Sequence, residues 1–170
     1  MGANKRAGLI DAGGGSSSLA SELVGAGYRD VSVLDLSVVA LRLACQRMGE
    51  AASRVQWIVA DVLDWEPARR YALWHDRAML HFFVDDADRR RYADAARRAI
   101  QPGGHAVIAT FAPDGPTECS GLPVRRSSAQ DIAQLLGDEF GLVREDRELH
   151  QTPGGTEQPF TWVVLQRAAT

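Results

Sequence analysis

The chain has 170 residues, of which 45% are hydrophobic and 24% charged, so it suits one globular domain with a single core. Its net charge of −3 at pH 7 gives no reason to expect binding to nucleic acids or anionic membranes. No apolar run approaches the roughly 20 residues of a membrane-spanning helix. We therefore expect one domain over residues 1–170, with neither nucleic acid nor membrane as a partner.

The first residues and the cysteines bear on the cellular compartment. Residues 1–6 lack the apolar core of a secretory signal peptide. Cys45 and Cys119 lie far apart in the sequence, and reduced thiols are the simple interpretation. These features predict a cytoplasmic protein.

In chain order, the first half alternates short apolar strands with helices. The expected elements are a strand at 7–11, a glycine loop at 13–15, a helix at 19–25, a strand at 31–35, a helix capped by Ser37 and running to about 48, and strands at 55–60 and 71–75. Strands that alternate with helices are typical of a parallel sheet with helices on both faces.

The second half ends in a hairpin. The expected elements are a helix from about 87 to 100 stopped by Pro102-Gly103-Gly104, a strand at 105–111, a loop at 113–123, a helix capped by Ser127 or Ser128 and running through Leu136, and strands at about 142–150 and 160–167 around a hairpin signal at 153–155. The pattern predicts an α/β fold, Rossmann-like and doubly wound, with seven strands and a C-terminal antiparallel hairpin. Its ligand crevice should lie beyond the carboxyl ends of the strands.

Three successive strand ends carry residues that suit a nucleoside ligand. The glycines at 13–15 let the backbone approach a ligand closely, just before a helix N-terminus. Asp35, at the end of the next strand, can accept both hydroxyls of an adenosine ribose. Asp61, at the end of the third strand, can accept a hydrogen bond from an adenine amino group.

These residues belong to motifs in a familiar order. The motifs are Asp11-Ala12-Gly13-Gly14-Gly15, Val33-Leu34-Asp35-Leu36-Ser37, Ala60-Asp61-Val62 and Ile100-Gln101-Pro102-Gly103-Gly104-His105. They resemble the first motif, the second motif, the adenine-binding segment and the Pro-Gly-Gly turn of class I S-adenosylmethionine (SAM)-dependent methyltransferases. The resemblance extends over nearly the whole chain, from about Leu9 to Arg167.

The resemblance implies SAM as cofactor, S-adenosylhomocysteine as product, and a set of cofactor-binding residues. That set is Asp11, Gly13, Gly14, Gly15, Asp35, Leu36, Asp61, Val62, Asp76 and Arg77. In the family the residue that matches Asp11 lies near the methionine ammonium group.

Trp74-His75-Asp76-Arg77-Ala78 shows a shorter resemblance, to the Trp-Asp-Arg stretch of thiopurine- and tellurite-type methyltransferases. In the family this strand end brings the cofactor methionine and the acceptor together. A general base is needed only if the acceptor is protonated near neutral pH, and the candidates are His75, Asp76 and His81. His81 is equally well interpreted as a half-buried structural histidine between Leu80 and Phe82. No metal ligands are assigned.

The sequence departs from the family pattern at two places. Ser17 stands where the third glycine of the first motif is usual, and the chain begins almost at its first strand. Family members usually carry an N-terminal helical segment that covers the cofactor. We therefore expect no N-terminal lid helix and a pocket open on that side, with the loop 112–124 as the internal substitute. A second chain could cover the opening, which would favour a homodimer.

The leading hypothesis is SAM-dependent methyl transfer to an O, N or S atom of a small-molecule acceptor. The alternatives are a non-catalytic module that binds SAM or S-adenosylhomocysteine, and a protein methyltransferase. A dinucleotide-dependent oxidoreductase is also compatible with the glycine loop and Asp35, but Asp61 and residues 102–104 favour the methyltransferase.

Overall fold

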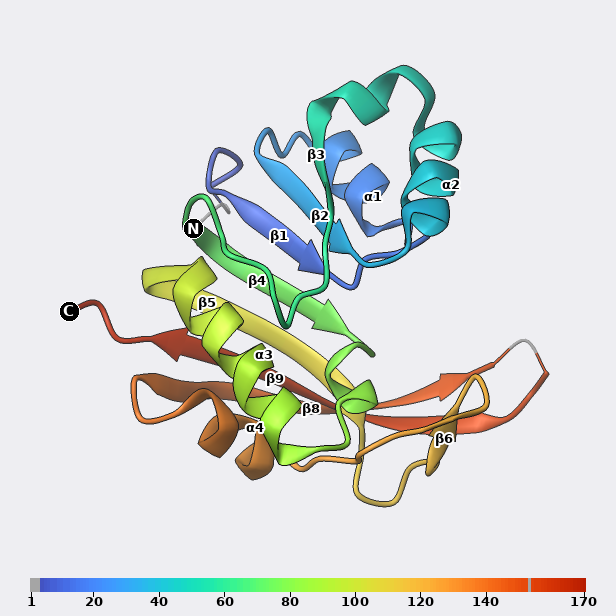
Figure 1. Ribbon diagram of the computed structural model, residues 1–170, viewed down its shortest axis with the longest axis vertical. Coiled ribbons are helices and arrows are strands. Elements are labelled where there is room, and N and C mark those ends of the chain that lie inside the picture. Colours follow the sequence, from blue (N-terminus) through green and yellow to red (C-terminus); the bar gives the residue numbers. More distant parts are fainter. Residues whose placement is uncertain (1–3, 153) are drawn as a thin grey trace.

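A seven-stranded sheet runs through the computed structural model, which describes residues 4–152 and 154–170 (Figure 1). The strands are β1 (Leu9–Ala12), β2 (Val31–Asp35), β3 (Val55–Val59), β4 (Tyr71–Arg77), β5 (Ile100–Phe111), β8 (Phe140–Gln151) and β9 (Glu157–Arg167). Their order is β3-β2-β1-β4-β5-β9-β8. β1 to β5 pair in parallel, and β9 pairs antiparallel to both β5 and β8. The predicted fold class is confirmed.

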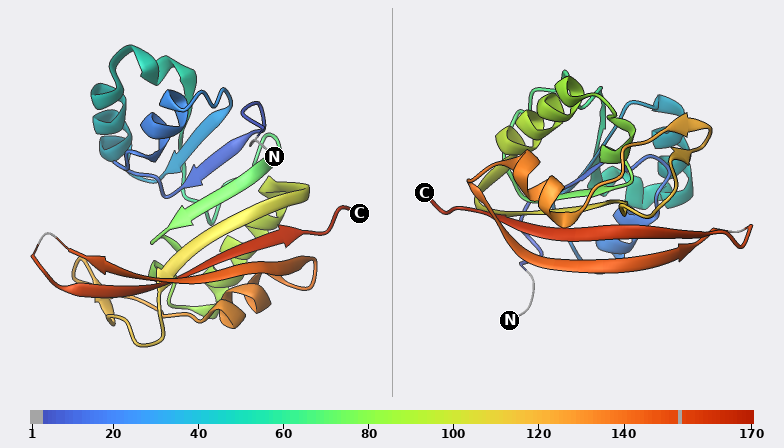
Figure 2. Two further views of the ribbon diagram at one scale, coloured as in Figure 1. Left: turned by 180° about the vertical axis from the view of Figure 1, so that it is seen from behind. Right: turned by 90° about the horizontal axis from the view of Figure 1, so that it is seen from below.

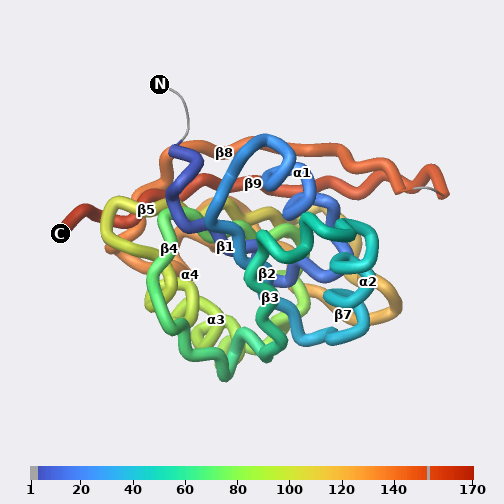
Figure 3. Tube along the Cα trace, turned by 90° about the horizontal axis from the view of Figure 1, so that it is seen from above, coloured from blue at the N-terminus to red at the C-terminus, as the bar shows by residue number. Residues whose placement is uncertain are grey.

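Helices cover both faces of this sheet. They are α1 (Leu19–Gly25), α2 (Val38–Met48), α3 (Asp86–Ala99) and α4 (Ala129–Leu136), with short 3-10 helices η1 (Gly49–Arg54) and η2 (Leu80–Phe82). On one face Val24 of α1 and Leu41 of α2 pack against Val33 of β2. On the other face α3 and α4 cover a second core, which contains Trp74 and Ile132. Seen from above, α3 and α4 lie across the sheet from α1 (Figure 3).

The predicted helix caps are present. The Ser37 hydroxyl accepts a hydrogen bond from the Ala40 amide at 3.2 Å and begins α2. Ser128 forms a reciprocal capping box with Asp131 at the start of α4. Side chains that accept from these amides satisfy donors that the first turn leaves without a helical partner. The cap at Ser37 also fixes the turn that follows Asp35.

Helices α1 and α2 cover only part of one face of the sheet, and the rest of that face is not covered by a helix. Within residues 4–152 and 154–170, no helix lies over β4, β5, β9 and β8 on this face (Figure 2). His75, Val107 and Trp162 project from three adjacent strands here and are only partly buried. We call this surface the bare face.

Two details differ from the expectations, and a third lies partly outside the described residues. The strand expected at 105–111 starts earlier, because β5 begins at Ile100. Residues 101–104 form an irregularity within this strand. There the pairing register between β4 and β5 shifts, between Tyr71 and Leu73 of β4. The loop expected at 113–123 contains a small hairpin, β6 (Glu118–Cys119) and β7 (Leu122–Pro123). The hairpin signal at 153–155 falls partly outside the described residues, because Pro153 is not among them.

Every helix in the described part of the chain is too short or too polar to cross a lipid bilayer.

Candidate active site

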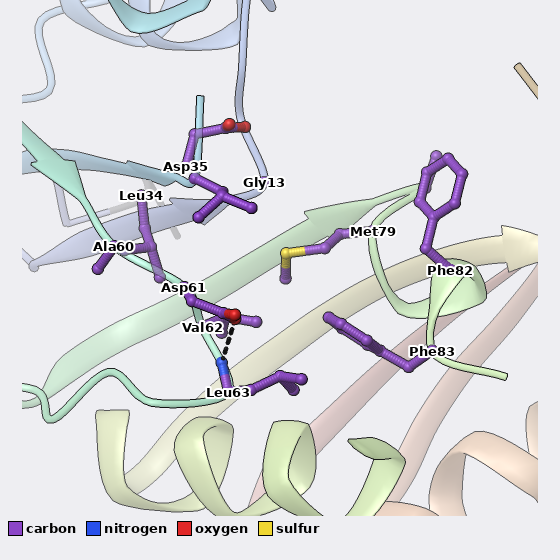
Figure 4. A pocket seen from close by; sticks show the side chains of 12 residues that line it. Gly13, Leu34, Asp35, Ala60, Asp61, Val62, Leu63, Met79, Phe82 and Phe83 are labelled. Atoms are coloured by element: carbon purple, nitrogen blue, oxygen red, sulfur yellow. Dashed lines mark hydrogen bonds between the residues drawn. The ribbon is translucent and has the colours of Figure 1, made fainter. Parts of the chain in front are cut away.

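A pocket of about 310 Å³ lies at the carboxyl ends of β1, β2 and β3, where doubly wound sheets bind their ligands (Figure 4). We call it the strand-end pocket. Its lining residues are Gly13, Leu34, Asp35, Leu36, Ala60, Asp61, Val62, Leu63, Ala78, Met79, Phe82 and Phe83. The lining is apolar except for the two carboxylates, so polar recognition in this pocket depends on Asp35, Asp61 and backbone groups.

The two carboxylates are fixed by the turns that follow their strands. One oxygen of Asp35, Oδ1, accepts a hydrogen bond from the Ser37 amide at 2.7 Å. Asp61 uses Oδ1 in the same way, accepting from the Leu63 amide at 2.9 Å. Such turns, in which Asp accepts from the amide two residues on, hold the side chain in one orientation. Within the described part of the chain, neither Oδ2 atom has a hydrogen-bond partner, so both are available to a ligand.

The glycine loop passes close to η2. Gly13 has a φ of +71°, and a Cβ added there would lie 2.8 Å from the Cβ of Met79. A side chain would therefore both strain the backbone and collide with Met79. The sequence places glycine here because this loop forms one wall of the pocket while Met79 forms the next.

A second cavity of about 460 Å³ lies on the other side of the glycine loop and opens at the bare face. We call it the polar cleft. It is lined by Asp11, Gly13, Gly14, Gly15, Ser16, Ser17, Ser18, Leu19, Glu22, His75, Arg77, Glu148 and Trp162. Gly13 lines both cavities, so they flank the same turn of backbone.

Asp11 and His75 form a carboxylate–imidazole pair in the polar cleft. The two residues are register partners on the parallel strands β1 and β4, so their side chains point to the same face of the sheet. Nδ1 of His75 lies 2.7 Å from Oδ1 of Asp11. A carboxylate in this position orients the ring and selects the tautomer with its proton on Nδ1, which leaves Nε2 as an acceptor.

Arg77 lines the cleft from the end of β4. Its guanidinium lies 4.8 Å from the ring centroid of Phe160 and 3.7 Å from Oε1 of Glu148. Glu148 also accepts a hydrogen bond from Nε1 of Trp162 at 2.6 Å. These contacts hold a cation at the edge of the cleft while it stays partly exposed.

Asp76 points the other way and is fully buried. Its carboxylate accepts from the Met79 amide at 2.9 Å, the Leu80 amide at 3.1 Å and the Tyr92 hydroxyl at 2.7 Å. Burial raises the pKa of Asp76 to about 6, and the hydrogen bond from Tyr92 opposes that rise. Asp76 lines neither cavity, and its contacts anchor the start of η2.

His81 is buried as well. Its ring lies 4.6 Å from the ring centroids of both Phe82 and Phe111. Neither ring nitrogen has a hydrogen-bond partner among the described residues. Burial, with a smaller contribution from the positive charge of Arg77, lowers the pKa of His81 to about 4. His81 is therefore a neutral side chain within an aromatic cluster at neutral pH, and it lines neither cavity.

The structure thus sorts the predicted site residues into three places. The strand-end pocket receives Gly13, Asp35, Leu36, Asp61 and Val62; the polar cleft receives Asp11, Gly13, Gly14, Gly15, His75 and Arg77; Asp76 and His81 lie in neither. Their assigned roles in binding or catalysis stay predictions.

Some lining residues carry no local sequence signal. Met79 and Phe83 reach the strand-end pocket from η2 and its flanks, and Glu148 and Trp162 reach the polar cleft from β8 and β9. The loop 112–124, expected as a substitute lid, lines neither cavity. Its Cys119 and Val124 pack against the aromatic cluster instead.

The comparisons with known proteins decide the family. The model of a methyltransferase domain family matches residues 9–104, which is more than half of the chain. The chain belongs to this family. It is a methyltransferase enzyme with a Rossmann-like fold. Solved methyltransferases of this fold hold the cofactor or its product: MtfA was solved with SAM and NodS with S-adenosylhomocysteine. A comparison with curated protein sequences finds no significant match.

Solved structures agree with the fold. A protein from work on the conversion of a disulfide bond into a thioacetal group during echinomycin biosynthesis is 26% identical, with a TM-score of 0.77 over 97% of this chain and 77% of that one. The N-methyltransferase NodS from Bradyrhizobium japonicum WM9 is 17% identical, with a TM-score of 0.77 over 95% and 86%. The 1,6-didemethyltoxoflavin-N1-methyltransferase of Burkholderia thailandensis is 23% identical, with a TM-score of 0.75 over 96% and 72%. The finer resemblance of residues 74–78 to thiopurine- and tellurite-type enzymes stays a prediction.

The strand-end pocket of the methyltransferase fits an adenosine group. Leu36 is apolar yet 70% exposed at the rim, where a flat base would cover it. The free oxygens of Asp35 and Asp61 supply acceptors for hydroxyl and amino groups at two edges of the same apolar pocket. In the described part of the chain, no group of three or more His, Cys, Asp or Glu side chains is placed to hold a metal ion.

Proposed function

We propose that this methyltransferase transfers the methyl group of SAM to an O, N or S atom of a small molecule. The observation that carries the proposal is that an apolar pocket with two carboxylates and a polar cleft with a histidine meet at Gly13. One cavity suits an adenosine group and the other offers polar groups next to it. Bound SAM supplies an activated sulfonium methyl group, so the protein mainly has to align the reactants and exclude water.

Four residues hold the adenosine group in this proposal. Asp35 accepts from the ribose hydroxyls and Asp61 from the adenine amino group. Leu36 and Val62 provide apolar contact for the base. The backbone of the glycine loop then directs the methionine portion toward the polar cleft, because Gly13 is shared by both cavities.

A small-molecule acceptor is supported by size and charge. The polar cleft has a volume of about 460 Å³, within the range of about 300–1,000 Å³ of small-molecule sites. The net charge of −3 gives no electrostatic reason for a polyanionic acceptor. The relative from Burkholderia thailandensis, whose structure holds 1,6-didemethyltoxoflavin, also acts on a small molecule.

We also propose that His75 is the general base for an acceptor that carries a proton. The bond from Nδ1 to Asp11 leaves Nε2 free to accept a proton, and the ring lines the polar cleft. Asp76 and His81 are the other two candidates, but the first uses both carboxylate oxygens in hydrogen bonds and the second is enclosed by aromatic rings. Asp11 then acts as a positioning residue through His75, in place of a direct contact with the methionine ammonium group.

The experiment is turnover of methyl-labelled SAM on a panel of small phenols, amines and thiols, with a protein mixture as a further arm. We expect transfer to at least one small-molecule class. Tight SAM binding without any transfer would favour the non-catalytic module, and transfer only to protein would favour a protein methyltransferase.

The role of His75 is tested with the accepted substrate. His75→Gln should lower kcat by roughly 10²-fold or more, with little change in SAM affinity. His105→Gln is the matched control, because His105, on the neighbouring strand β5, also lies at the bare face but lines neither cavity. Equal activity of the two variants would exclude His75 as the base.

A further inference from the structure

A third cavity, separate from the active site, is built around arginines. It has a volume of about 450 Å³ and lies between the first turn of α3, the segment before α4, and α4 itself. We call it the arginine pocket; its lining residues are Asp86, Arg89, Arg90, Arg125, Arg126, Ser127, Asp131, Gln134 and Leu135. It shares no residue with the strand-end pocket or the polar cleft.

Arg89 is the buried centre of this pocket. Its side chain is only 4% exposed, which is rare for an arginine. Nη2 donates a hydrogen bond to the Ser127 hydroxyl at 3.1 Å, whereas Nη1 is buried and has no partner among the described residues. A buried guanidinium with an unused nitrogen costs stability unless an acceptor reaches it.

The two carboxylates of the pocket do not supply that acceptor. Asp86 is paired with Arg125, and Asp131 accepts from the amide and the hydroxyl of Ser128. Within residues 4–152 and 154–170, no carboxylate lies within 4.0 Å of Arg89. Burial, and next the positive charge of Arg125, lower the pKa of Arg89 below its ordinary value, as expected for a cation that lacks enough negative charge nearby.

The charge of the pocket defines the ligand. Four guanidinium groups face two carboxylates, so the lining has two positive charges in excess. A phosphate group carries about −1.5 to −2 charges at neutral pH and three acceptor oxygens, which matches this excess more closely than a single carboxylate does. Guanidinium groups bind phosphate oxygens in a bidentate manner, so the four arginines that line this cavity suit a phosphate group.

We propose that the arginine pocket is a phosphate-binding site, in which Arg89 is the buried ligand and Arg90, Arg125 and Arg126 neutralise the remaining charge. The ligand is a phosphomonoester or inorganic phosphate. Because the backbone amide of Arg125 donates to the His81 carbonyl at 2.8 Å, the pocket is joined to the segment that carries Phe82 and Phe83 of the strand-end pocket.

The experiment is calorimetric titration of the full chain with inorganic phosphate and, separately, with ribose 5-phosphate, at constant ionic strength set with chloride. We expect saturable binding of at least one probe. Tighter binding of the sugar phosphate by tenfold or more assigns the site to a phosphorylated small molecule, and equal affinity assigns it to free phosphate. The absence of saturable binding of both probes at tens of millimolar would overturn the proposal.

Variants locate the site. Arg89→Met should weaken phosphate binding at least tenfold and leave the melting temperature without ligand unchanged or higher, because it removes an unpaired buried charge. Arg90→Gln, an exposed change that does not depend on the core, should weaken binding about threefold. Arg91→Gln is the matched control: it lies next along α3, pairs with Asp64 and lies outside the pocket. Equal weakening by Arg90→Gln and Arg91→Gln, or unchanged binding in Arg89→Met, would refute a specific site.

Discussion

Substitution of Asp35 gives the most direct test of the cofactor site, because one of its carboxylate oxygens has no partner within the described residues. Oδ1 already accepts from the Ser37 amide, so Oδ2, which has no partner among the described residues, is the main acceptor for the ribose hydroxyls. A hydrogen bond to a charged acceptor contributes roughly 1.5–3 kcal/mol, so losing it should weaken binding about ten- to a hundredfold. Asp35→Ala removes both interactions. Asp35→Asn keeps a carbonyl oxygen for the Ser37 amide but removes the charge, so it separates ribose recognition from the turn.

The assay is calorimetric titration with S-adenosylhomocysteine, which cannot be turned over. We expect at least tenfold weaker binding for Asp35→Ala and a similar loss for Asp35→Asn, with wild-type circular dichroism for both variants. Asp138→Ala is the control, because Asp138 is an exposed acid away from the strand-end pocket, and its affinity should be unchanged. Wild-type affinity of Asp35→Ala would refute the assignment, and loss of folding in Asp35→Ala alone would leave Asp35→Asn to decide it.

Three further predictions concern other parts of the same site. Asp61→Asn should weaken S-adenosylhomocysteine binding less than the two substitutions of Asp35, because the new amide can turn and still accept a hydrogen bond. Unchanged binding by Asp61→Ala would show that adenine is held elsewhere. Gly13→Ala should lower the free energy of unfolding by about 1–3 kcal/mol in urea titrations, because a Cβ meets Met79 at 2.8 Å, whereas Gly25→Ala, with open space around it, should not. Because burial raises the pKa of Asp76 to about 6, the folded chain retains a proton that the unfolded chain loses near pH 4. The free energy of unfolding of wild type minus that of Asp76→Asn should therefore fall by about 3 kcal/mol as pH rises through both pKa values, from about 3 to 7, and a constant difference would contradict the burial argument.

The expected homodimer stays a prediction, and the bare face is the surface to which it refers. Sedimentation checks it directly: a concentration-dependent shift in mass would support self-association, and a constant monomer mass would exclude it.

The strands and helices were predictable where local pattern and global fold agree. Helix α1 and strand β2 have the predicted bounds, because an apolar run and its flanking turn residues define each end. The start of β5 was not predictable, since Pro102 and Gly103 usually end an element, yet residues 101–104 continue the strand as an irregularity beside β4. Pairing with a neighbouring strand, which the local sequence does not encode, decides that boundary.

The cofactor residues could be found from the sequence for a similar reason. Asp35 and Asp61 each end a strand, and parallel strand ends converge on one edge of the sheet. The pair of Asp11 and His75 could not be predicted from the sequence. It depends on the pairing register between β1 and β4, and the two residues are 64 positions apart in the chain.

The period of the strand explains why one motif serves two purposes. In sequence, His75, Asp76 and Arg77 form a single polar cluster, but β4 extends through Arg77, so successive side chains alternate between faces of the sheet. His75 and Arg77 point to the bare face and line the polar cleft, whereas Asp76 points into the core and anchors η2. Alternate residues of this motif therefore have different roles, according to the face of the sheet on which they lie. Residues on the bare face can meet a substrate, and Asp76 affects it only by placing Met79 against the glycine loop.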